Sequence, residues 1–257
     1  MKIALNSVKR TWTNRFVVPA MLGTLTVFSA APAATQASTI TQWNFNSAPA
    51  DANTSTGTLL PSIGAGTTSL VGGTTGSFAS GDASGGSTDP AVGDDSARNT
   101  TTYPAQGTND KTAGIAFAVS TVGFQGITVN WDQRHSNTAS RYIQFQYSTD
   151  GTSFVDFGPL FDANVGGDVW YNNRSVDLST VPAVNNNANF AFRVVSAFAP
   201  SSSVYAPSTA TSTYGVTGTQ RFDMVTVSGV EVPEPAALSL CGLAMLSLLA
   251  ARRNRLA

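Results

Sequence analysis

The chain has 257 residues, with 14 lysines and arginines against 15 aspartates and glutamates, and a formal net charge of −1. All the acidic residues lie between residues 38 and 235 with only seven basic ones, so this part carries about −8. Such a charge repels phosphate backbones, and we expect no nucleic-acid binding. The single cysteine, Cys241, lies in an apolar run near the end, which excludes a disulfide and a thiolate site from the rest of the chain.

The first 37 residues have the order of a secretory signal peptide. A basic region precedes an apolar run over 16–30, and small residues follow over 31–37. The basic residues are Lys2, Lys9, Arg10 and Arg15. We expect export with cleavage after Ala37, because Ser38 opens the first strand-like run. Cleavage after Ala33 and an uncleaved membrane anchor are the alternatives.

Between the two ends, apolar residues recur at every second position, as in Ile127, Val129 and Trp131. This period predicts β-strands with one buried face, and no long amphipathic helix is indicated. The expected strands are 39–46, 114–120, 126–133, 140–148, 154–157, 169–178, 189–197 and 221–230. Short antiparallel strands in this number predict one all-β domain over 38–230, a two-sheet, jelly-roll-like sandwich.

Residues 57–112 differ in composition from the rest of this domain. They are nearly all Gly, Ser, Thr, Asp and Ala, which predicts a long surface excursion. Short strands around 59–63 and 68–78 would complete the sandwich.

Two short runs resemble carbohydrate-binding sandwiches of the galactose-binding-like kind. Residues 142–154, YIQFQYSTDGTSF, are similar to a strand-turn-strand unit of these folds, with Asp150-Gly151 as the turn. Residues 221–227, RFDMVTV, are similar to their closing strand. The resemblance implies the fold more than an activity, because sandwiches host unrelated functions and ligands bind in the loops.

No catalytic constellation stands out. A Ser-His-Asp triad would need His135, which lies in a run that we interpret as a solvated turn, and no Gly-x-Ser-x-Gly motif accompanies it. A paired-carboxylate hydrolase would have to rely on aspartates. The candidates are Asp132, Asp156, Asp162 and Asp223. We therefore assign no catalytic residue and expect no enzyme activity.

The excursion contains four aspartates that are candidate calcium ligands: Asp82, Asp89, Asp94 and Asp95. A hard cation prefers several oxygen ligands, which carboxylates and backbone carbonyls supply. Their spacing fits no EF-hand loop. The alternative is that these acidic residues only keep an exported protein soluble.

A second group of candidates could bind glycan: Trp170, Tyr171, Asn172, Asn173 and Arg174. Aromatic faces stack on the apolar side of a sugar ring, and amide and guanidinium groups bind its hydroxyls.

The final segment, 231–257, combines three features. It opens with a motif in which two prolines hold the backbone extended and accessible, Val232, Pro233, Glu234 and Pro235. Residues 236–251 are apolar and uncharged and would span about 24 Å as a helix, slightly short for a bilayer core. The segment ends in basic residues that hold the terminus in the cytoplasm, Arg252, Arg253 and Arg255.

This order of features resembles the PEP-CTERM sorting signal, over the tail alone. The resemblance implies that a membrane-embedded exosortase recognises Pro233, Glu234 and Pro235, removes the transmembrane helix, and passes the protein to the cell surface. A proline-rich stalk before an ordinary membrane anchor is the alternative.

The sequence thus predicts an exported protein, transiently anchored in the inner membrane and then placed at the cell surface or in the extracellular matrix. Its expected role is structural or adhesive, in exopolysaccharide or biofilm. The expected partners are an exosortase-type enzyme and exopolysaccharide, and calcium is the one cofactor considered. The alternative is a carbohydrate-binding module for a matrix glycan, and a secreted hydrolase is the third.

Overall fold

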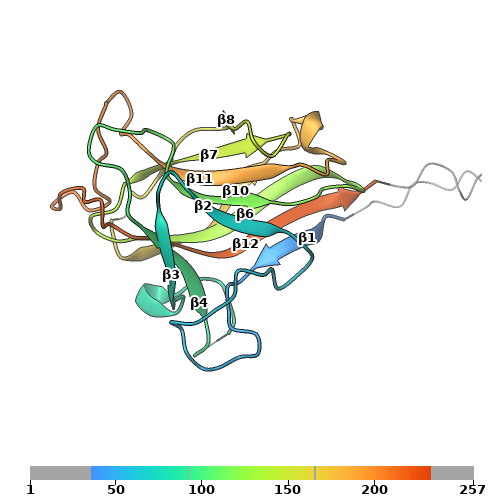
Figure 1. The fold of residues 1–257 in the computed structure, drawn as a ribbon, viewed down its shortest axis with the longest axis horizontal. Coiled ribbons are helices and arrows are strands. Elements are labelled where there is room, and N and C mark those ends of the chain that lie inside the picture. Colours follow the sequence, from blue (N-terminus) through green and yellow to red (C-terminus); the bar gives the residue numbers. More distant parts are fainter. Residues whose placement is uncertain (1–35, 92, 165, 233–257) are drawn as a thin grey trace, which may run out of the picture. The chain divides into compact units, whose positions relative to one another are not determined.

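The structure is a computed structural model that describes residues 36–91, 93–164 and 166–232. The predicted signal helix and the sorting tail from Pro233 onward lie outside the described residues. Within the described part, no helix is long and apolar enough to cross a membrane. The described residues form two antiparallel sheets and two short 3-10 helices, η1 (Ala83–Gly85) and η2 (Pro182–Val184) (Figure 1).

Sheet A has six strands in the order β10-β6-β12-β4-β3, and β1 pairs with the second half of β12. Its strands are β1 (Ser38–Trp43), β3 (Thr75–Ser80), β4 (Ser96–Thr101), β6 (Phe124–His135), β10 (Val169–Asp177) and β12 (Gln220–Glu231). Register shifts interrupt the pairing of β6 with both of its neighbours, between Tyr171 and Arg174 on β10 and between Asp223 and Thr226 on β12. Such bulges leave extra residues unpaired and redirect their side chains.

Sheet B also has six strands, in the order β2-β5-β11-β7-β8, with β9 pairing beside β8 on β7. Its strands are β2 (Thr67–Val71), β5 (Gly114–Ala118), β7 (Tyr142–Ser148), β8 (Val155–Asp156), β9 (Phe161–Asp162) and β11 (Ala191–Ala197). The turn after β7 contains Gly151 at φ 78°, a left-handed conformation that glycine adopts without strain.

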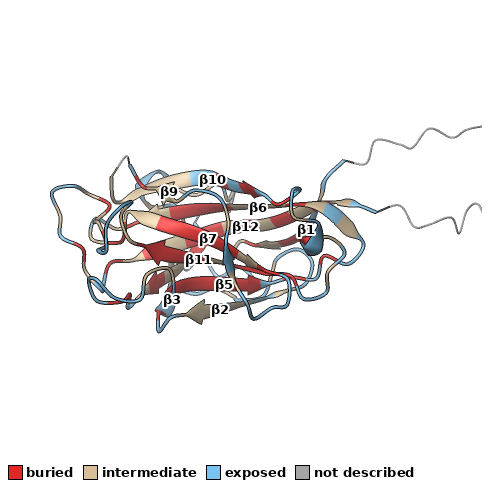
Figure 2. Ribbon diagram, turned by 90° about the horizontal axis from the view of Figure 1, so that it is seen from above, coloured by how far each residue is buried: buried red, intermediate tan, exposed pale blue. Residues whose placement is uncertain are grey.

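Buried residues lie on the strands of both sheets (Figure 2). The core that they form is rich in aromatic rings. Trp131 of β6 stacks on Phe145 of β7 at 5.9 Å between centroids, and Phe145 stacks on Phe192 of β11 at 5.6 Å. All three side chains are essentially inaccessible to solvent. Each of these residues lies on the core-facing side of its own strand, where every second side chain points inward. The two-residue apolar period of the sequence therefore produces this packing.

A buried chain of hydrogen bonds also joins the sheets. The Trp131 indole donates to Gln133, the Gln133 amide donates to Gln220, and the Gln220 amide donates to the Ser196 hydroxyl of sheet B, at 3.0–3.1 Å. Each buried polar group in this chain therefore has a partner, which avoids the cost of an unsatisfied group.

The predicted two-sheet antiparallel sandwich is confirmed. Two local expectations differ from the structure. Residues 57–112 contain three strands, β2, β3 and β4, and β4 was not expected because its sequence, SARNTT, lacks an apolar period. His135 is not a solvated turn residue, because β6 continues through it and buries its side chain completely.

Candidate cation site and the neighbouring hollow

Two aspartates lie opposite each other on the outer face of sheet A. Asp132 of β6 is the register partner of Asp223 of β12, and both alternate with residues that point into the core. Yet Asp132 is 1% exposed and Asp223 is 0% exposed. The connection between β3 and β4 buries them, because it folds back over this face. We call residues 81–91 of this connection the cover segment.

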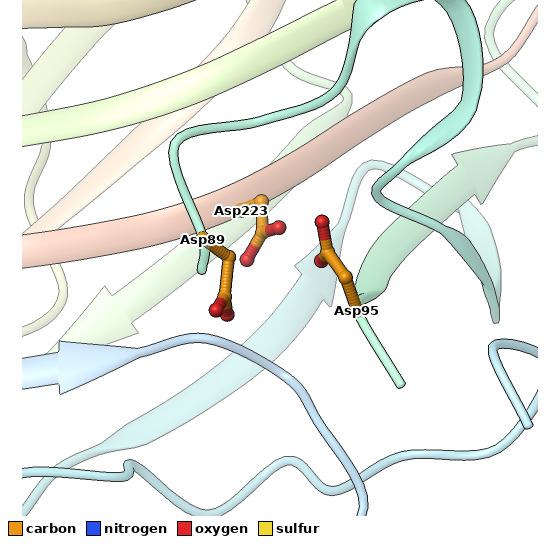
Figure 3. Close-up of side chains that lie close together, drawn as sticks. All are labelled: Asp89, Asp95 and Asp223. Atoms are coloured by element: carbon orange, nitrogen blue, oxygen red, sulfur yellow. The ribbon is translucent and has the colours of Figure 1, made fainter. Parts of the chain in front are cut away.

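Asp223 is part of a cluster of three carboxylates, the acid cluster of Asp89, Asp95 and Asp223 (Figure 3). One carboxylate oxygen from each lies within 4.8 Å of the others. Asp89 comes from the cover segment, Asp95 directly precedes β4, and Asp223 stands at the bulge of β12. The cluster thus joins the β3–β4 connection to β12, which is distant from it in sequence.

Hydrogen bonds satisfy only part of this cluster. Asp89 accepts the N–H of Ala91 and the side-chain amide of Asn46, each at 2.9 Å. Asp95 accepts the Ser87 hydroxyl through Oδ2, and Asp223 accepts the N–H of Met224 through Oδ1. The remaining oxygens, Asp95 Oδ1 and Asp223 Oδ2, are buried, and no donor group of the described residues bonds to them. The two carboxyl groups can bond to each other only when a proton is shared between them.

The electrostatics of the cluster are those of buried acids that lack a counter-charge. Burial raises the pKa of Asp223 well above its usual range, and repulsion from Asp95 adds to the increase. Burial also raises the pKa of Asp95. The ion pairs of the described part lie elsewhere, at Lys111–Asp156, Arg134–Asp168 and Arg141–Asp162.

This donor set suits a hard divalent cation. It offers carboxylate oxygens only, two of them buried and reached by no donor group, and an ion there would supply the missing positive charge. Gly81 lies so close that a Cβ in its place would stand 2.0 Å from Asp95 Oδ1. The close approach explains why glycine stands at this position.

The structure brings together two of the four aspartates predicted as calcium ligands. Asp89 and Asp95 belong to the acid cluster, whereas Asp82 accepts the N–H of Gly93 and Asp94 accepts the N–H of Asp51. The third member, Asp223, was not predicted as a ligand. Its only signal is an acidic residue in a strand, and the sequence does not show which loop crosses that strand.

A polar hollow of about 300 Å³ lies beside the acid cluster on the same face. It is lined by residues of β1, β6, β10 and β12 and by one residue of the cover segment: Gln42, Asn130, Trp131, Asp132, Asn173, Met224, Thr226 and Thr88. Asp132 fixes its wall, because Thr88 donates its N–H and its hydroxyl to Oδ2, at 2.6 Å each, and Asn173 donates its N–H to Oδ1 at 2.7 Å. Asn173 and Met224 have positive φ values and belong to the two bulges that flank β6.

The five residues predicted to bind glycan are divided between two faces of β10. Trp170 pairs with Arg134 on the outer face, where its indole donates to Ala83 of the cover segment at 2.8 Å. Asn172, in the bulge, donates to Gly86 at 3.1 Å, and Asn173 lines the hollow. Tyr171 and Arg174 pair instead with residues whose side chains point into the core.

Arg174 lies between two aromatic rings, 4.8 Å from Tyr171 and 5.2 Å from Phe161. It is 7% exposed, and burial lowers its pKa to about 10. The arrangement therefore brings Trp170, Asn172 and Asn173 to the cover segment and the hollow, and places Tyr171 and Arg174 at the inner side of the sheet edge.

His135 lies at this inner side, with its ring edge-on to Tyr171 at 5.7 Å and its Nδ1–H donating to the Ser140 carbonyl. Burial, with repulsion from Arg174, lowers the pKa of His135 to about 3, so the ring is neutral at pH 7. Asp132 already accepts hydrogen bonds on both of its oxygens.

No protein-family model matches the chain, and no curated protein matches it. Among solved structures, it is similar to the CBM22-1 xylan-binding domain of Paenibacillus barcinonensis Xyn10C, with 11% identity over 78% of this chain and 100% of that domain, at a TM-score of 0.42. The CBM22-1-CBM22-2 tandem of the same protein matches with 9% identity over 75% of this chain and 50% of the tandem, at 0.44. TmCBM61 in complex with β-1,4-galactotriose matches with 11% identity over 52% of this chain and 70% of that chain, at 0.28. These proteins are carbohydrate-binding modules, and xylan and galactotriose are named for them alone.

Proposed function

We propose that the sandwich binds a calcium ion at the acid cluster and belongs to an exported, non-catalytic protein of the cell surface or matrix. The observation that carries the calcium site is the pair of buried carboxylate oxygens on Asp95 and Asp223 that no donor group reaches, in a cluster with Asp89 that no cationic side chain of the described residues pairs with. A proton shared between Asp95 and Asp223 is the alternative to an ion. An unpaired carboxylate in such a place costs several kcal/mol unless a proton or a cation neutralises it.

Calcium fits this donor set better than zinc or magnesium. Zinc favours histidine and cysteine ligands, and His135 is bonded to Ser140 rather than to the cluster. Magnesium demands a near-ideal octahedron, whereas calcium accepts irregular sets of oxygen ligands from flexible segments. The cluster takes its ligands from one loop, the β3–β4 connection, and from one strand, which is an arrangement that calcium tolerates.

The test is the thermal stability of the full-length chain, purified in detergent, with calcium and with EDTA. An ion at about a hundred times its dissociation constant stabilises the folded state by about 2.7 kcal/mol, which raises the Tm of a domain of this size by about 5–10 °C. Asp223→Asn should abolish the increase without lowering the Tm in EDTA, because the carboxylate that it removes has no counter-charge. Asp177→Asn, an exposed acid of β10, is the matched control and should respond like the wild type.

Glycan binding is the second candidate function, and the polar hollow favours it. Its amide groups, on half-buried Asn130 and exposed Asn173, match the hydrogen-bonding needs of sugar hydroxyls. Affinity electrophoresis through the host's exopolysaccharide tests it. Asn130→Ala should reduce the retardation, and Asn189→Ala, an exposed residue before β11, should not. A wild-type protein that migrates unretarded with calcium present would contradict glycan binding.

The surface location is proposed from the two terminal segments of the sequence. The geometry of the sandwich is compatible with cleavage at both ends, because Ser38 pairs with Gly229 and the last described residue, Val232, still bonds to Gly123 (Figure 1). Cleavage after Ala37 and beyond Val232 would thus leave every strand intact. Glu234→Ala should block removal of the tail, so that full-length protein accumulates in the membrane fraction. A variant that is processed like the wild type would contradict the sorting motif.

A further inference from the structure

Polar contacts hold the cover segment on sheet A. Its sequence from 81 to 91, GDASGGSTDPA, has no apolar side chain larger than proline. Its contacts to the sheet include the Trp170 indole on Ala83, the Asn172 amide on Gly86 and the Arg134 guanidinium on Ser84. A segment with few apolar contacts opens locally at a small free-energy cost.

Successive residues of this segment belong to two different sites. Thr88 forms one wall of the hollow and donates two hydrogen bonds to Asp132. Asp89, the next residue, contributes its carboxylate to the acid cluster. The other two members of the cluster, Asp95 and Asp223, belong to the sheet itself or directly adjoin it. Because the two residues are adjacent in the chain, an interaction that holds Asp89 in the cluster also fixes the position of Thr88.

Whether the interaction of Asp89 with the other two acids favours closure of the cover segment depends on the cation. Without it, closure places the Asp89 side chain beside two buried carboxyl groups that no cationic side chain of the described residues pairs with, which costs the desolvation of these acids. With it, the ion is shared by Asp89 and the two sheet carboxylates, and a link of this kind is much stronger than the hydrogen bonds of the segment.

We propose that the cation acts as a latch: it closes the cover segment over the outer face of sheet A and so sets Thr88 in the wall of the hollow. The inference rests on the calcium site proposed above. It adds that a hydroxyl-rich ligand in the hollow requires calcium even though Thr88 and Asp132, rather than the ion, form the wall. It also adds that half-buried Trp170 becomes more accessible when the ion is removed, because its indole bonds to Ala83 of the segment.

Hydrogen exchange of the full-length chain in detergent, followed by mass spectrometry, tests the latch. With calcium, the amides of 81–91 should exchange at least about tenfold more slowly than with EDTA, while those in the centre of β6 should not change. Hydroxyl-radical labelling of Trp170 should increase in EDTA. Asp89→Asn should remove both calcium effects. Asp82→Asn is the matched control on the same segment, outside the cluster, and should retain them.

Calorimetry on the same samples separates the two proposals. If calcium binds and the exchange of 81–91 and the labelling of Trp170 stay unchanged, the latch is wrong and the calcium site stands. If no binding heat is measured and the Tm does not respond to calcium, the calcium site is wrong and the latch fails with it.

Discussion

Asp223 lies on strand β12, and its side chain is inaccessible to solvent. Its side chain points to the outer face of β12, as alternation with Phe222 requires, and the β3–β4 connection closes over it. A carboxylate in this environment is neutralised by a proton or by a metal ion, because its charged form is poorly solvated. The raised pKa values of Asp95 and Asp223 and the proposed calcium site have this one physical cause.

His135 should make the stability of the fold depend on pH. The pKa of its ring is about 3 in the folded chain and about 6.5 in the unfolded chain, so below pH 6.5 the unfolded chain binds a proton that the folded chain does not. The contribution of His135 to the free energy of unfolding should therefore fall by about 2 kcal/mol between pH 7 and pH 5. Urea denaturation at both values measures it.

His135→Gln is the comparison, because it removes the titrating group and keeps a hydrogen-bond donor. Asp95 and Asp223 titrate in the opposite sense and stabilise the fold as the pH falls, but they are present in both proteins and cancel in the difference. The charged and titratable groups that act on the His135 ring are Arg174 and Tyr171. An equal change of stability in both proteins would contradict a buried neutral histidine.

At the level of single residues, the sequence indicates which side chains could bind a cation better than it indicates which of them lie close together in the fold. Asp89 and Asp95 were predicted as cation ligands because they lie close together in an acidic segment. Asp223 and Asp132 were not, because their proximity depends on strand register and on the path of a loop. His135 was placed in a turn because Ser136, Asn137 and Thr138 are turn residues, and the strand continues to the residue just before them.

The close approach of the cover segment to Asp95 requires glycine at position 81. A Cβ on Gly81 would stand 2.0 Å from Oδ1 and 2.5 Å from Oδ2 of Asp95, so Gly81→Ala must displace that carboxylate. We expect a loss of about 1–3 kcal/mol of stability and at least a tenfold weaker affinity for calcium, measured by denaturation and by calorimetry.

The double variant Gly81→Ala/Asp95→Ala identifies the cause. It should recover stability relative to Gly81→Ala, because the clash is gone, but it should not recover calcium binding. A Gly81→Ala protein that binds calcium like the wild type would show that Asp95 is not a ligand.

The strands were predictable where one face is buried and the other is polar. Expected and observed ranges of β6, β7, β10, β11 and β12 overlap over most of their lengths because the apolar period of two is regular there. The period fails in β3 and β4, which carry Ser, Thr, Gly and Asn. Backbone hydrogen bonds place them in the sheet, β4 on β12 and β3 on β4, and the side chains that β4 buries are small or polar. Bulges at Asn173 and Met224 were not foreseeable, since neither residue type demands a positive φ.

For the whole molecule, the aromatic core carries the stability. Phe145 is 0% exposed and stacks on Trp131 and Phe192, so Phe145→Ala should lower the free energy of unfolding by about 3–5 kcal/mol. Val155→Ala, on β8 and 55% exposed, is the control and should change it by less than about 0.5 kcal/mol. Chemical denaturation measures both, and equal effects would contradict the two-sheet core.

The central claim is that the buried carboxylates of this sandwich hold a calcium ion. Crystals grown with calcium and measured at a wavelength where calcium scatters anomalously test it most directly. We expect an anomalous peak among Asp89, Asp95 and Asp223, with oxygen atoms at 2.3–2.6 Å from it. A map with no peak there, and with the carboxyl groups of Asp95 and Asp223 in direct hydrogen-bond contact, would contradict the claim.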